Sequence, residues 1–116
     1  MALSLSAANG QSRCLCIGLE DSGIVVETGP NVEGLAPGER MVPSFVASCG
    51  RCGMCREGRP ALCQPASVAN MAGTLMDGTT RLHSNGVPIH HHSGVAAFAE
   101  HAVISQSALV KIDPSI

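Results

Sequence analysis

Four cysteines in the middle of the chain constrain its fold more than any other feature of the sequence. Cys49, Cys52, Cys55 and Cys63 are separated by two, two and seven residues. Two-residue spacers let successive thiolates turn around one point, and the longer return brings the fourth thiolate from the opposite side. Because four thiolates complete a zinc tetrahedron and leave no open position, the spacing predicts a structural rather than a catalytic zinc site.

The residues around the cysteines favour zinc over other uses of four thiols. Three of the 7 basic residues, Arg51, Arg56 and Arg59, lie in this loop, and positive charge stabilises thiolates. The alternatives are two disulfides or free thiols, an iron–sulfur cluster, for which the last spacing is unusual, and a redox-active thiol protein. The redox alternative has only the cysteine count to support it.

Length and composition narrow the class of protein. The 116 residues are enough for one domain, and with no Trp, no Tyr and 2 Phe its core must be aliphatic. A net charge of −2 argues against nucleic acid or an anionic membrane as a partner. No apolar stretch approaches the roughly 20 residues of a membrane span, and the chain start does not read as a secretory signal. We therefore expect a cytoplasmic protein with reduced cysteines that are free to bind metal.

Local patterns predict a mainly β fold, arranged as a barrel or a sandwich. Runs of β-branched and apolar residues predict strands over 24–28, 41–47, 96–104 and 108–112, although Pro43 should confine the second to an edge or a bend. Turns are predicted at 77–78 and 86–88, while residues 65–80 are expected to be irregular and no long helical pattern is seen. Residues 1–17 form an unassigned leader.

Five stretches follow one another in an order that is specific as a set. They are Met41-Val42-Pro43-Ser44-Phe45, the four-cysteine loop, Asp77-Gly78-Thr79-Thr80-Arg81, Pro88-Ile89-His90-His91 and Lys111-Ile112-Asp113-Pro114. With them the chain, from about Gly18 to its end, resembles the zinc-dependent alcohol dehydrogenases of the medium-chain dehydrogenase/reductase superfamily. Members with this long zinc lobe include glutathione-linked and mycothiol-linked formaldehyde dehydrogenases.

The resemblance implies a fold, a metal site and a reaction. Residues 18–116 would form a partial GroES-like barrel, the catalytic domain of such an enzyme, with a zinc-binding lobe over about 48–64. Cys49, Cys52, Cys55 and Cys63 would be the ligands of the structural zinc. The full-length enzyme would use NAD to oxidise or reduce a small-molecule alcohol or aldehyde. The resemblance is also compatible with a homo-oligomer, since the family's lobe lies near a subunit interface.

The same comparison finds no catalytic residue in this chain. The family's Gly-His-Glu-Gly motif, which supplies a catalytic zinc ligand, matches Gly18-Leu19-Glu20-Asp21-Ser22-Gly23, and Leu19 has no atom that binds zinc. The two catalytic cysteines would fall before the start and after Ile116, because Cys14 and Cys16 lie too close to Leu19. No nucleotide-binding Gly-x-Gly-x-x-Gly unit is present. We therefore expect an inactive portion of an enzyme, or alternatively a non-catalytic zinc-stapled β-module that binds a protein partner.

Other polar residues invite weaker interpretations. On a strand only His90 and His92 of the His90-His91-His92 run could share a metal, so a surface or cleft-lining role is favoured for these histidines. Arg81 lies in a family motif and is expected to have a structural role.

Overall fold

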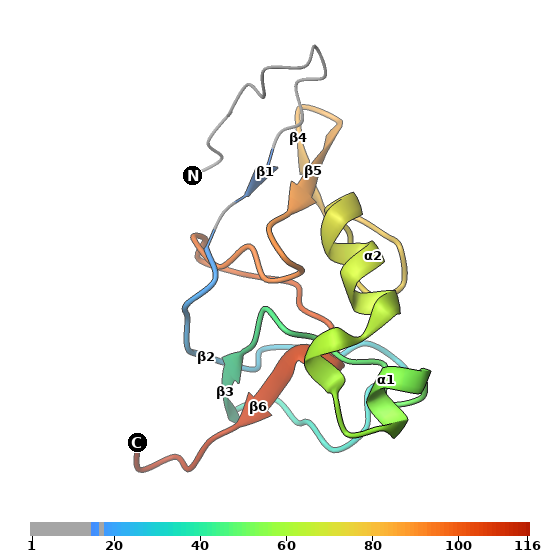
Figure 1. Ribbon diagram of the computed structural model, residues 1–116. Helices are drawn as coiled ribbons and strands as arrows, with labels where there is room; N and C mark the ends of the chain where they lie inside the picture. Colours follow the sequence, from blue (N-terminus) through green and yellow to red (C-terminus); the bar gives the residue numbers. More distant parts are fainter. Residues whose placement is uncertain (1–14, 17) are drawn as a thin grey trace.

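Two small sheets and one main helix form the part of the chain described by this computed structural model, residues 15–16 and 18–116. The sheets have the strand orders β1-β5-β4 and β2-β3-β6. They lie toward opposite ends of the molecule, with α2 along the side between them (Figure 1). The strands are β1 (Leu15–Cys16), β2 (Gly23–Ile24), β3 (Arg40–Pro43), β4 (Leu82–Ser84), β5 (Val87–His91) and β6 (Leu109–Lys111). The helical segments are α1 (Gly53–Arg56), η1 (Pro60–Leu62), α2 (Gln64–Ala72) and η2 (Gln106–Ala108). The predicted mainly β class is confirmed.

The β2-β3-β6 sheet contains three of the four predicted strands in shortened form. β3 pairs antiparallel with both neighbours, with Met41 opposite Gly23 on one side and Lys111 on the other. An edge or a bend was predicted at Pro43: β3 is the middle strand of its sheet, but Pro43 is its last residue and lies past the pairing with β2. The proline is tolerated because β2 reaches only as far as Met41. Ser44 N–H donates to Ala108 O on the β6 side (2.7 Å), so by strand alternation the missing N–H of Pro43 faces the side without a partner.

The β4–β5 hairpin was not predicted. Its turn is Asn85-Gly86, with φ values of 50° and 78°, which are the left-handed angles that a type I′ hairpin turn requires. The turn predicted at 86–88 is thus displaced, because Val87 and Pro88 already belong to β5. Among the described residues, β1 pairs with β5 at His90 and His91, two residues beyond the proline.

Two other local predictions are wrong. Residues 65–80 are not irregular throughout, because α2 occupies their first half. Pro65 lies in the first turn of α2, and Gly73 ends it at φ 70° with N–H bonds back to the helix carbonyls, as is typical of helix ends. The strand predicted over 96–104 is absent, because the chain turns here: Val95 N–H donates to His92 O (3.0 Å) and Ala96 has φ 53°.

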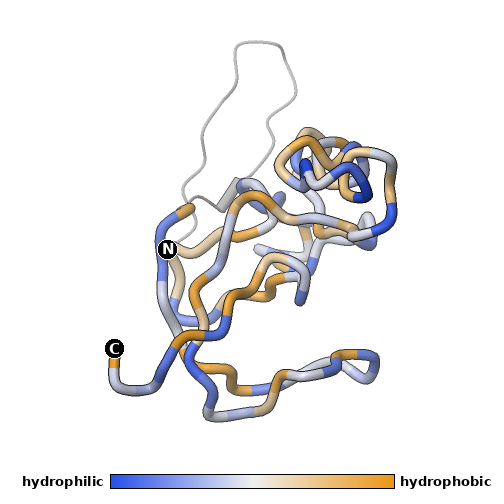
Figure 2. Tube along the Cα trace, turned by 60° about the horizontal axis from the view of Figure 1, so that its bottom comes forward, coloured by the Kyte–Doolittle hydropathy of each residue, from blue (hydrophilic) through white to orange (hydrophobic). Residues whose placement is uncertain are grey.

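Alanines make up about half of the buried hydrophobic residues in the described part of the chain. Among them are Ala47, Ala66, Ala69 and Ala108, whereas Phe45 and Phe98 are 49% and 58% exposed. Hydrophobic residues are spread along the coloured part of the trace rather than gathered in one segment (Figure 2). Small side chains bury little area, so the fold gains little from the hydrophobic effect per residue. Within the described residues, no helix has the length and apolar character needed to cross a membrane.

Candidate metal centre

The four cysteines come from three successive turns of backbone between β3 and α2. Cys49 lies in the loop after β3, Cys52 precedes α1, and Cys55 lies inside α1. Cys63 ends η1 and precedes α2. Gly50 and Gly58, at φ 71° and 78°, provide two of the left-handed positions that let this backbone turn so tightly.

The four sulfur atoms converge on one point. All four Sγ atoms lie within 4.8 Å of one another, and the Cys52 and Cys55 sulfurs are 3.5 Å apart. In a zinc tetrahedron with bonds of about 2.3 Å, the sulfur–sulfur edges are about 3.8 Å. The donor set and its spacing therefore fit a structural zinc ion.

Backbone N–H groups point at these sulfurs and stabilise negative charge on them. Cys52 N–H donates to Cys49 Sγ, and Cys49 N–H donates to Cys63 Sγ, both at 3.3 Å. The backbone N–H groups of Arg51 and Cys52 lower the pKa of Cys49. Hydrogen bonds, of which that from the Cys55 N–H is the strongest, lower the pKa of Cys52 to about 6. Burial, together with the hydrogen bond to Cys52, raises the pKa of Cys55 to about 11.

Cys63 ties the cluster to the core. It is 2% exposed and packs with Ala47, Ala66 and Ala108, while the other three cysteines contact this group from its outer side. A metal held by all four sulfurs would therefore fasten the α1 turn to α2 and to the end of η2. Since α1 and η1 contribute no buried residue of their own, little else holds the lobe in place.

The three arginines of the lobe present their side chains to solvent. Arg51, Arg56 and Arg59 are all exposed. Within residues 18–116, the ion pairs formed are Arg81–Asp77 and Lys111–Glu39, so none of the lobe arginines is paired. Their positive field favours thiolates, but salt screens it over about 10 Å.

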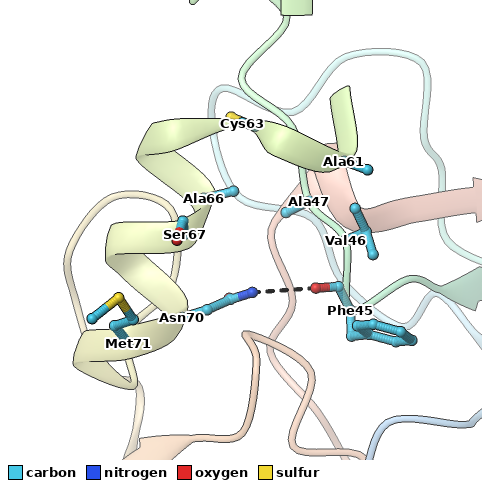
Figure 3. A pocket seen from close by; sticks show the side chains of 9 residues that line it. All are labelled: Phe45, Val46, Ala47, Ala61, Cys63, Ala66, Ser67, Asn70 and Met71. Carbon is cyan, nitrogen blue, oxygen red and sulfur yellow. Dashed lines mark hydrogen bonds between the residues drawn. The ribbon is translucent and has the colours of Figure 1, made fainter. Parts of the chain in front are cut away.

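An apolar groove opens beside the cluster between α2 and the segment after β3 (Figure 3). Its volume is about 250 Å³. It is lined by Phe45, Val46, Ala47, Ala61, Cys63, Ala66, Ser67, Asn70 and Met71. Asn70 Nδ2 donates to Phe45 O (3.2 Å) and holds the two walls together. The sequence prediction missed this groove because it missed α2, although Pro65 and Gly73 mark both ends of that helix.

The segment that resembles the catalytic histidine motif is fixed by a close backbone approach. Gly18 has φ 122°, and a Cβ there would lie 2.5 Å from the backbone N of Phe98. Ala97 N–H donates to Gly18 O (3.2 Å). Leu19 is half-buried and Glu20 is exposed. Across residues 18–116, the cysteines form the only group of three or more His, Cys, Asp or Glu side chains arranged for a metal.

The two cysteines before Leu19 have no described side chain. Cys14 lies outside the described residues. For Cys16 only the backbone is described, as part of β1.

His91 is the buried histidine of the run, at 1% exposure, so the expected surface or cleft-lining role is wrong for this residue. Its backbone N–H donates to Gly73 O (2.9 Å). Its ring Nε2 accepts a hydrogen bond from the backbone N–H of Arg81 (3.2 Å). Burial, followed by the nearby charges of His90 and Arg81, lowers the pKa of His91. The backbone of His91 thus joins the end of α2 to β5, while its ring joins the backbone of Arg81 to β5.

Arg81 has the structural role predicted for it. Its Nη2 pairs with Asp77 Oδ2 (2.9 Å), and its Nε donates to Thr79 Oγ1 (2.8 Å). These contacts close the loop between α2 and β4.

Comparison with known proteins links this geometry to one family. The model of the alcohol dehydrogenase GroES-like domain matches residues 5–114. The S-(hydroxymethyl)glutathione dehydrogenases of Escherichia coli O1:K1 / APEC and of Shigella sonnei (strain Ss046) are each 39% identical over 98 residues, which is 84% of this chain and 27% of those proteins. The chain thus spans about a quarter of the length of these relatives.

One solved structure is similar to the chain over most of its length. It is an alcohol dehydrogenase zinc-binding domain protein from Burkholderia ambifaria. The TM-score is 0.77 at 32% identity, covering 87% of this chain and 28% of that one. This likeness confirms the predicted fold class, a partial GroES-like fold.

Proposed function

Because the chain belongs to the alcohol dehydrogenase GroES-like domain family, we propose that it is part of the catalytic domain of a zinc-dependent, nicotinamide-linked alcohol dehydrogenase. In this proposal Cys49, Cys52, Cys55 and Cys63 hold one structural zinc ion. The observation that carries it is the convergence of four sulfurs within 4.8 Å. The family match over residues 5–114 supports the same assignment.

The zinc acts on structure and takes no part in the reaction. Four thiolates fill its tetrahedron, so no position is open to a substrate oxygen. Its effect is to cross-link the lobe, which buries almost no side chain of its own, to Cys63 in the core. Such an ion stabilises the folded state by the free energy of its binding.

The activity of the whole protein would be oxidation of a small alcohol or reduction of an aldehyde, with NAD accepting or donating the hydride. The relatives named S-(hydroxymethyl)glutathione dehydrogenase favour a hydroxymethyl thiol adduct as the substrate. In such chemistry a second zinc, with an open position, polarises the alcohol oxygen.

Residues 1–116 alone should not catalyse this reaction. Leu19 stands where the family has a zinc-binding histidine. It is half-buried, and it follows Gly18, whose O accepts a hydrogen bond from Ala97 N–H. We therefore assign no catalytic and no NAD-binding residue to this chain, and domain bounds of 18–116 with a lobe over about 48–64.

The experiment is metal analysis of the purified chain combined with a dehydrogenase assay. We expect close to one zinc per chain, its loss in Cys52→Ser and its retention in Met54→Leu, a control in the same turn. We expect no NAD-dependent oxidation of ethanol or of a hydroxymethyl thiol. Two zinc ions with turnover would overturn the inactivity of the chain. No zinc, with the thiols of Cys49, Cys52, Cys55 and Cys63 all titratable, would overturn the metal site.

A further inference from the structure

We propose that Cys52 and Cys55 form an oxidisable pair, so that a peroxide closes a disulfide between them and releases the zinc. The inference rests on the proposed zinc site and goes beyond it, because it assigns a modification to two of the four ligands. Oxidation at the lobe would then remove the metal cross-link and destabilise the fold.

The two sulfurs are already in contact. Cys52 and Cys55 flank the first turn of α1, and Arg56 N–H donates to Cys52 O (3.0 Å), which closes that turn. Their sulfurs are 3.5 Å apart. A disulfide needs about 2.05 Å between sulfurs and about 4.4 to 6.8 Å between Cα atoms, a separation that residues three apart in a helical turn satisfy. Side-chain rotation is enough to form the bond, and α1 need not unfold.

The pair also lies in the accessible part of the cluster, which includes the partly exposed Cys49. Cys52 and Cys55 are both partly exposed, in a turn of which no residue is buried. Cys63 is 2% exposed and packs with Ala47 and Ala66 in the core. Access limits oxidation of thiolates, so Cys63 should react last.

The reaction balances with hydrogen peroxide as the oxidant. One thiolate of the pair attacks a peroxide oxygen, so that an S–O bond forms, the O–O bond breaks and one water leaves after protonation. The second thiolate attacks this sulfur, forming the S–S bond and expelling the hydroxyl group as a second water. Two thiolates lose two electrons in all, peroxide gains them, and two protons from solvent complete the two waters.

Loss of the pair removes half of the metal's ligands. A disulfide sulfur carries no negative charge, so only Cys49 and Cys63 could still bind the ion, and two thiolates do not complete a tetrahedron. Zinc should therefore leave in step with the disulfide. Reduction of the disulfide in the presence of zinc should restore the site.

The arginines of the lobe make the test direct. Trypsin cuts after Arg51 and Arg56 but not between Arg59 and Pro60, so Cys49, Cys52 with Cys55, and Cys63 fall into the peptides 41–51, 52–56 and 57–81. The zinc-loaded chain is titrated with hydrogen peroxide, zinc release is followed with a chromogenic chelator, and remaining thiols are alkylated before digestion. The Met54→Leu variant is run alongside, because it removes methionine oxidation from peptide 52–56.

We expect one zinc released for each peptide 52–56 that loses two hydrogens, with Cys49 and Cys63 still open to alkylation and full reversal by thiol and zinc. A first disulfide that joins peptides 41–51 and 57–81 would overturn the proposal. So would sulfinic acid in place of a disulfide, or retention of zinc after the pair is oxidised. Metal analysis before peroxide is added tells these failures apart from failure of the proposed zinc site, because a chain without zinc contradicts that site directly.

Discussion

The cysteine lobe, residues 49–63, and the β4–β5 hairpin, residues 82–91, achieve order by different means. In the lobe, α1 and η1 span four and three residues, bury none of them, and share the sulfur cluster as their meeting point. In the hairpin, three residue pairs are in register, and Ile89 and His91 are buried. We therefore expect the lobe to depend on a bound metal ion for its order, whereas the hairpin is held by backbone hydrogen bonds and packing.

Removal of the metal should separate the two regions most strongly. We expect Cys52→Ser to abolish zinc binding, raise amide exchange in residues 49–63 by at least about tenfold, and expose the Arg51 and Arg56 bonds to trypsin. Amide exchange in β4 and β5 should be unchanged. Hydrogen-exchange mass spectrometry with Met54→Leu as the control measures both. Equal loss of protection in the hairpin would mean that the two regions unfold as one unit.

His91 should contribute more to the stability of the hairpin than its other side chains do, as zinc should for the lobe. Replacement by Ala removes a buried ring and the acceptor for Arg81 N–H, and should lower the free energy of unfolding by about 2 to 4 kcal/mol. Chemical denaturation of the zinc-loaded chain measures this loss. The exposed His83→Ala, in the same hairpin, is the control and should change it little. A His91→Ala chain as stable as the parent would contradict the role given to this ring.

The same residue predicts a pH dependence with a definite sign. Burial holds the folded-state pKa of His91 below the ordinary value of 6.5, so at acidic pH the unfolded chain binds more protons than the folded chain. The stability from the neutral ring is full above about pH 6.5 and is lost as pH falls toward the folded-state pKa. His91→Gln keeps an acceptor without a titrating proton, so unfolding curves between pH 7 and pH 5, in the presence of excess zinc, should show a flatter profile for it than for His83→Gln.

The junction between α2 and β5 should show a smaller effect. Gly73 has φ 70°, and a Cβ there would lie 2.8 Å from His90 Cβ, so Gly73→Ala combines backbone strain with a steric clash and should cost about 2 to 3 kcal/mol. Gly78→Ala is the matched control. Its φ is 78°, but an added Cβ would meet no atom of a non-neighbouring residue within 4 Å. It should cost only about 1 kcal/mol. Thermal unfolding of both variants measures the difference, and equal losses would refute the close contact.

The Asp77–Arg81 pair should contribute least. Its side chains are about half exposed, and exposed pairs contribute less than about 1 kcal/mol. The pKa of Asp77 is lowered chiefly by the Thr79 hydroxyl, with Arg81 a smaller cause. Arg81→Gln should thus alter stability less than Thr79→Val in the same unfolding assay, and the reverse order would show that the ion pair matters more than the loop's hydrogen bonds.

Sequence alone predicted the cysteine lobe but not α2 or the hairpin. The lobe was found because metal ligation depends on residue type and spacing, both of which are visible in Cys49 to Cys63. α2 was missed because its two buried residues, Ala66 and Ala69, are too small to give a clear hydrophobic period. Only its terminal signals, Pro65 and Gly73, mark it in the sequence.

The predictions for the hairpin and for the segment after it were wrong for other reasons. The turn predicted at 86–88 includes Pro88 and overlaps Asn85-Gly86, the dipeptide that forms the actual hairpin turn. The segment 96–104 has the composition of a strand, but Ala96 and Ala97 are buried where the chain meets Gly18, far away in the sequence. A contact between distant residues leaves no local pattern from which to predict it.

The central claim, that four cysteines hold one zinc ion in a closed site, is tested most directly by zinc X-ray absorption on the purified chain. We predict a first shell of four sulfur atoms at about 2.3 Å and no nitrogen or oxygen neighbour. A shell with fewer than four sulfurs, or with a bound water oxygen, would contradict it, because the ion would then have an open position.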